Sequence, residues 1–139
     1  MAKGGTTTND LMKFYFYNVS MPSYGNVLYV SLHTADPGVS GNQMTYETAY
    51  TGYTRVGVSR TSGISGFVVT SGVAVNTSLI QVPLCTANPR AVSHFAVGTT
   101  SGTSMAGQIL HYGSLSSGIT VFVGYAPQFA AGLLSVVEV

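Results

Sequence analysis

The chain has 139 residues, the length of a single domain, and 6% of its residues are charged against about 25% in ordinary soluble domains. With 45% hydrophobic residues it does not have the composition of a disordered chain. A net charge of +1 without a basic cluster, and no apolar run of ~18 residues, argue against nucleic acid and membranes as partners.

Residues 1–20 form the first predicted segment. Residues 1–9 are small and polar, and we expect a mobile arm that becomes ordered only in an assembled particle. The run "DLMKFYFYN" has helical spacing, with Thr8 or Asn9 as its cap, and also alternates as a strand would. We favour a short helix. We expect its aromatic residues to form an interface: Phe14, Tyr15, Phe16 and Tyr17.

The segment "NVLYVSLHT" alternates as a strand. Its pattern predicts a core face and a half-exposed face, made respectively by Leu28, Val30 and Leu32 and by Tyr29, Ser31 and His33. Val56 and Val58 of a following strand should point into the same core. "ADPG" then predicts a structural turn at Asp36, Pro37 and Gly38, in which the Asp36 carboxylate bonds to its own turn.

A long polar loop at residues 39–52 follows the turn, and loops of this length usually carry function or contacts. It and the next strand contain further predicted interface residues: Met44, Tyr46, Tyr50 and Tyr53. Tyrosines suit an interface because they offer large contact area with a polar end. A sugar-stacking surface is the alternative, which the scarcity of Asp, Asn and Glu beside them makes less favoured.

Short strands separated by Gly, Ser, Thr and Pro fill the rest of the chain. We predict them at residues 53–60, 66–70, 73–76, 79–82, 91–97, 108–115, 119–123 and 133–137. No long helical period is present after residue 20 to make parallel crossovers, so the sheets should be antiparallel. The sequence therefore predicts an all-β, jelly-roll-like β-sandwich as a single domain at residues 21–139, preceded by the arm and short helix.

Candidate catalytic and metal-binding residues are few. His33 and Asp36 are three positions apart, but a strand-end histidine followed by a turn aspartate explains them without chemistry. His33, His94 and His111 show no metal-ligand spacing. Cys85 stands in an apolar setting and reads as an inert buried thiol, and Arg55 as a scaffold residue that stacks on Tyr53. We expect no enzyme activity, no cofactor and no metal.

"LYVSLHTADPG", followed by a polar loop and "TGYTRVGVSR", resembles a family of small tailed-bacteriophage structural proteins. Members typically have a strand ending in an LHTADPG-like turn, here residues 32–38, and then a Gly-Tyr-x-Arg strand, here residues 52–55. "NTSLIQVPLCT", "AVSHFAVGTTSGTSMAGQILHYGSL" and "YAPQFAAGLLSV" extend the likeness over most of residues 27–137. The N-terminal "DLMKFYFYNV" departs from it, because relatives often begin with a clearer charged helix.

The resemblance implies a part of the virion that has no catalytic role. Small size, low charge and the arm favour a capsid cement or decoration protein on the outer capsid surface. There it would bridge and stabilise subunits of the major capsid protein and contact copies of itself. A tail, tail-fibre or baseplate protein is the alternative, although no internal repeat typical of long fibres is present. A glycan-binding module for host attachment is the second alternative.

Overall fold

The structure is a computed structural model and describes residues 1–138. The regular secondary structure of that part is mostly strand, in antiparallel sheets, with a single short helix, which confirms the predicted all-β sandwich. In chain order the elements are β1 (Ala2–Lys3), α1 (Gly5–Phe16), β2 (Val27–His33), β3 (Val56–Ser59), β4 (Phe67–Thr70), β5 (Val73–Asn76), β6 (Ile80–Gln81), β7 (Arg90–Gly98), β8 (Ile109–Val121), β9 (Gln128–Phe129) and β10 (Ser135–Val137).

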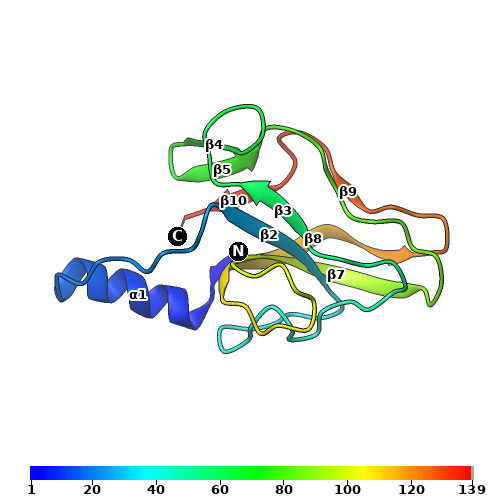
Figure 1. The fold of residues 1–139 in the computed structure, drawn as a ribbon, viewed down its shortest axis with the longest axis horizontal. Helices are drawn as coiled ribbons and strands as arrows, with labels where there is room; N and C mark the ends of the chain where they lie inside the picture. Colours follow the sequence, from blue (N-terminus) through cyan, green and yellow to red (C-terminus); the bar gives the residue numbers. More distant parts are fainter. Residues whose placement is uncertain (139) are drawn as a thin grey trace.

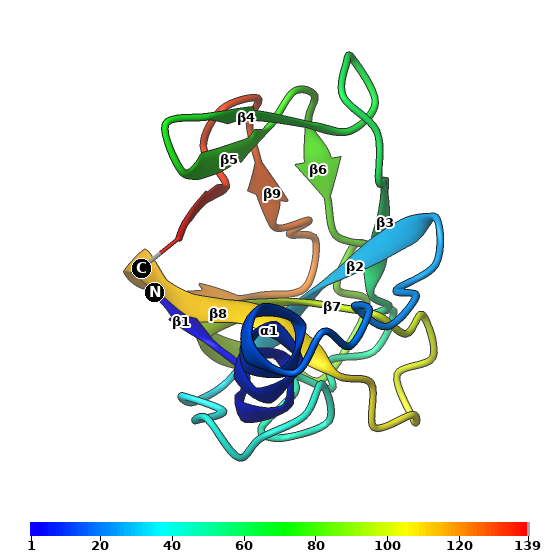
Figure 2. The same ribbon diagram turned by 90° about the vertical axis from the view of Figure 1, so that its left-hand side faces the viewer.

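The strands form a five-stranded sheet in the order β1-β8-β7-β2-β3, a three-stranded sheet β10-β5-β4 and a two-stranded sheet β6-β9. Figure 2 shows the two small sheets lying over one face of the large sheet, while α1 and two long loops lie on its other side. The large sheet is therefore covered on both faces. This arrangement decides which residues are buried.

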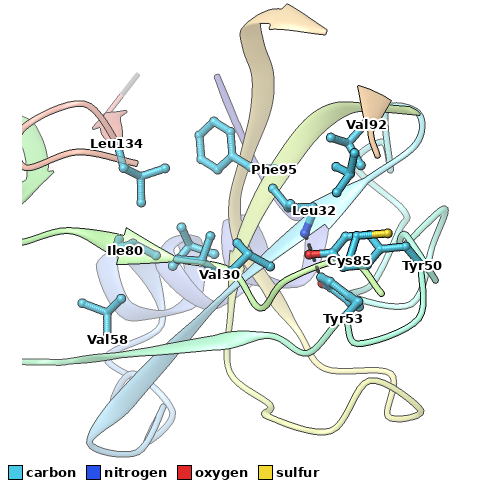
Figure 3. Packing of buried hydrophobic residues seen from close by; sticks show 13 residues of the cluster. Val30, Leu32, Tyr50, Tyr53, Val58, Ile80, Cys85, Val92, Phe95 and Leu134 are labelled. Carbon is cyan, nitrogen blue, oxygen red and sulfur yellow. Dashed lines mark hydrogen bonds between the residues drawn. The ribbon is translucent and has the colours of Figure 1, made fainter. Parts of the chain in front are cut away.

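The main hydrophobic core lies between the large sheet and the small ones (Figure 3). Val30 and Leu32 of β2 each retain 1% of their surface, and Val58 of β3 is also buried. In the ladder Val30 pairs with Val56, and Leu28 with Val58. The predicted core face of this strand is confirmed, because alternate residues of a strand share one face.

The second face of β2 differs from the prediction. Ser31 and His33 are fully buried instead of half-exposed. The loop at residues 39–52 folds back across this face, and the Thr48 backbone N–H donates to the Leu32 carbonyl at 2.9 Å. The His33 Nδ1–H donates to the Thr45 carbonyl at 2.8 Å, and its Nε2 accepts from the Ser31 hydroxyl at 2.8 Å. Hydrogen bonding within the domain thus compensates the burial of the imidazole.

The first residues lie on the sheet, which corrects the expectation of an arm ordered only in a particle. Ala2 and Lys3 pair antiparallel with β8, and the Thr7 hydroxyl donates to the Ile109 carbonyl at 2.8 Å. The helix begins at Gly5 with Gly4 as its N-cap, so the predicted caps are wrong. A Cβ on Gly4 would lie 2.3 Å from the Ile109 carbonyl oxygen, so only glycine permits this close approach.

Strand positions after residue 53 agree with the prediction apart from two differences. The strands predicted at 108–115 and 119–123 are the single strand β8, whose pairing with β7 shifts register between Val92 and His94. The bulge lets both halves pair with the same neighbour, so the intervening serines do not end the strand. The two-residue β9 gave no periodic signal and was not predicted.

Candidate interaction surfaces

Charged side chains from the loop and β3 region meet inside the protein in a buried ion pair. The Arg55 Nε donates to Glu47 Oε1 at 2.7 Å and its Nη2 to Oε2 at 2.8 Å. The Arg55 side chain has no accessible surface and that of Glu47 retains 6%. Arg55 also donates to the carbonyls of Thr100 and Met105, each at 2.9 Å. This bidentate pair holds two loops against β2 and leaves neither charge free for a substrate.

Tyr50 and Tyr53, which we predicted as interface residues, are core residues. They retain 2% and 9% of their surface, and their rings pack edge to face with centroids 5.4 Å apart. The Tyr53 hydroxyl donates to Glu47 Oε1 at 2.8 Å and accepts from the Leu32 backbone N–H at 3.2 Å, a contact drawn in Figure 3. Burial raises the pKa of both phenols. The sequence pattern missed this because a buried tyrosine and a contact tyrosine have the same local neighbours.

The residues considered for catalysis have structural partners. The Asp36 carboxylate accepts from the Gly38 backbone N–H at 2.8 Å, which is the predicted turn bond, and Gly38 has a φ of +71°. Cys85 is buried, with its Sγ 3.3 Å from the Ala87 carbonyl oxygen. Arg55 pairs with Glu47, so the predicted stack on Tyr53 is not its main contact. Within residues 1–138, no three His, Cys, Asp or Glu side chains gather in a way that would hold a metal ion.

Gln43 is a buried residue that the sequence analysis did not single out. Its Oε1 accepts from the Thr100 backbone N–H at 3.0 Å, so it connects the same two loops as Arg55. A Cβ on Gly98 or Gly107 would lie 2.2 Å or less from its side chain. Glycines at both positions therefore make room for this amide, and only the tertiary structure brings the three residues together.

The other predicted interface residues are exposed. Phe14, Tyr15, Phe16 and Tyr17 lie at the C-terminal end of α1, with between 49% and 73% of their surface accessible. Figure 1 shows α1 extending from the body of the domain along its longest dimension. The helix is fixed at its beginning, where Thr7 is its buried residue. Met44 and Tyr46 are also exposed, on the loop after β2.

A second exposed apolar surface was not predicted. Phe122, Val123 and Tyr125 follow β8, and Leu84 is a further exposed apolar side chain. The rings of Phe122 and Tyr125 contact each other edge to face at 5.9 Å. The apolar run "TVFVGYAP" was a signal for it, but we assigned residues 119–123 to a strand in the sandwich.

A model of the family described as Podophage GP4 fiber I protein gp80 matches residues 4–137. No curated protein matches the chain. The described residues contain no helix with both the length and the apolar character needed to cross a membrane.

Proposed function

The chain belongs to the family of the podophage GP4 fiber I protein gp80, and on that premise we propose that it is a structural subunit of a tail fibre. The observation that carries this proposal is the extent of the match, residues 4–137, which includes α1 and every strand from β2 to β10. A structural protein of a tailed phage virion was the coarser prediction, and the family supports it. That the LHTADPG turn marks the family stays a prediction.

The family description favours the tail alternative over the capsid cement protein that we first expected. It names a fibre and makes no reference to a capsid, so it lends no support to the major capsid protein as partner. The partners in this proposal are other tail proteins and further copies of the chain. Nucleic acid and membranes are not among them, because the surface lacks the clustered Lys and Arg that phosphates require.

In this proposal the protein acts by holding its shape and its contacts, without catalysis or a cofactor. The buried Glu47–Arg55 pair supports this role, since its two charges hold parts of the domain together and are not accessible to a substrate. Host-glycan binding is less favoured than before, because the rings of Tyr50 and Tyr53 are packed in the core. A sugar cannot stack on a ring that has no accessible face.

Immunogold labelling of purified virions tests the proposal. Antibodies against this chain should place gold on the tail appendages and leave the capsid shell unlabelled. Particles assembled without the chain, stained in parallel, are the matched control for nonspecific gold. Gold over the shell would reinstate the capsid cement prediction. If intact virions carry no gold and denatured particles from the same preparation also lack the chain, both the tail and the capsid shell are rejected as its location.

A further inference from the structure

The last two turns of α1 are mostly apolar and yet exposed. Met12, Phe14, Tyr15 and Phe16 are spread around the helix axis, and each has about half or more of its surface in contact with solvent. Large apolar side chains of a helix are normally buried against a partner. This helix extends away from the sheets (Figure 1), so no other part of the described chain covers it.

One side of the exposed helix is shaped to receive another helix. Asn9, Met12, Lys13, Phe16 and Tyr17 line a groove of about 310 Å³. The first four of these residues have the spacing i, i+3, i+4 and i+7. Four residues at that spacing form the hole into which a side chain of a facing helix inserts when two helices pack. The groove therefore fits a helix better than it fits an extended peptide.

The exposed aromatic area at the end of α1 is as large as the largest apolar patches of typical monomers. Aromatic side chains present about 150–250 Å² each. Exposures between 49% and 73% at residues 14–17 therefore leave roughly 500 Å² of aromatic surface in water, before Met12 and Val19 are added. The largest apolar patch of a typical monomer measures about 300–600 Å² and is often functional, whereas a standard interface buries about 800 Å² on each partner. The patch on α1 therefore has the size of a functional contact surface that is smaller than a standard interface.

We propose that copies of this chain associate through α1, with apolar side chains of one helix filling the groove on the next. The partner is a second copy because each copy carries both the groove and the protruding aromatic side chains that fill such a groove. The net charge of +1 gives little repulsion between copies. Lys13 lines the groove and is exposed, and a lysine can cover apolar surface with its aliphatic stem while its ammonium group stays in water.

The inference rests on the proposed function in one respect, that a fibre places copies side by side. The association experiment itself does not depend on where on the virion the chain lies. The patch of Phe122, Val123 and Tyr125 has similar exposure and a groove of about 390 Å³ beside Tyr125, but it lacks a helix. That patch provides a matched control.

Sedimentation velocity of the full chain from about 1 to 100 μM tests the inference. The wild-type protein should form oligomers in this range. Met12→Ser combined with Phe16→Ser should weaken self-association by roughly 30-fold or more, the loss expected of a hot spot. Phe122→Ser combined with Tyr125→Ser should leave it within about threefold. All four side chains are exposed, so circular dichroism should show both variants folded.

Cysteine cross-linking provides a second measurement. Phe16→Cys should form an intermolecular disulfide upon mild oxidation, because the native Cys85 is buried and does not compete. A wild-type chain that stays monomeric at 100 μM would overturn the inference. So would a loss of self-association in the Phe122→Ser, Tyr125→Ser variant together with unchanged self-association in the Met12→Ser, Phe16→Ser variant. If immunogold labels the tail but the purified chain stays monomeric, only the inference is rejected. Oligomers that depend on α1, with gold on the capsid shell, would reject only the proposed function.

Discussion

Glu47→Gln should strongly destabilise the domain. The substitution keeps the size of the side chain and its acceptor oxygen but removes the charge opposite Arg55. The Arg55 side chain has no accessible surface, so its cation would stay in the interior without a counterion. Breaking one side of a buried pair costs about 3–5 kcal/mol. In a chain of this length that loss lowers the melting temperature by roughly 10–15 °C.

Denaturant unfolding followed by circular dichroism measures the effect, and two variants control it. Glu138→Gln removes the carboxylate that pairs with Lys3 at the surface, where the Glu138 side chain is 54% exposed, and should cost about 1 kcal/mol or less. Glu47→Leu combined with Arg55→Met removes both buried charges. It should recover at least half of the loss, because no unpaired charge remains.

The expected difference between Glu47→Gln and Glu138→Gln is therefore several-fold in free energy. A Glu47→Gln protein within about 1 kcal/mol of wild type would refute the reasoning, since it would show that water reaches Arg55 in the native state. If the Glu47→Leu, Arg55→Met variant were less stable than Glu47→Gln, an unpaired charge would not be the cause of the destabilisation. The hydrogen bonds from Arg55 to the carbonyls of Thr100 and Met105 would then carry the stability.

The remaining predictions concern the core, the N-terminus and pH. Leu32→Ala should cost about 2–5 kcal/mol in urea unfolding, because Leu32 is 1% exposed and its removal leaves a cavity. Thr7→Val should cost about 1–3 kcal/mol, since the buried hydrogen bond to the Ile109 carbonyl is lost. Thr6→Val, at an exposed position, is the control. Burial lowers the pKa of His33 in the folded protein below its ordinary value of 6.5. Below pH 6.5 the unfolded chain therefore binds a proton more readily than the folded one, and the free energy of unfolding should fall as the pH drops towards the folded-state pKa. His33→Gln should reduce that slope, and an unchanged slope would contradict the assignment.

The structure changes the expected effect of deleting residues 1–9. From the sequence, deletion of residues 1–9 should have left the melting transition nearly unchanged. In the structure these residues contribute the pairing of β1 with β8 and the buried Thr7 hydroxyl. Deletion should therefore lower the melting temperature of the free protein. The sequence could not show this, because the segment has little apolar surface and is held by backbone and hydroxyl bonds.

Local patterns in the sequence determined most of the strands and the first core face. The alternation of Leu28, Val30 and Leu32 identifies one face of β2, because successive side chains of a strand point to opposite sides. Asp36, Pro37 and Gly38 specify their turn through local chemistry alone. Low charge, frequent Gly and short strands were enough for the all-β class.

Only the tertiary structure decided what covers the other face of that sheet. The loop at residues 39–52 folds over β2 and buries Ser31 and His33, which alternation had placed towards solvent. The same fold brings Glu47 to Arg55 and turns Tyr50 and Tyr53 inward, while the aromatic residues of α1 remain outside. Tyrosines in these places look alike in sequence, because burial depends on which distant segment packs against a side chain. Periodicity reports only the direction in which that side chain leaves its own strand or helix.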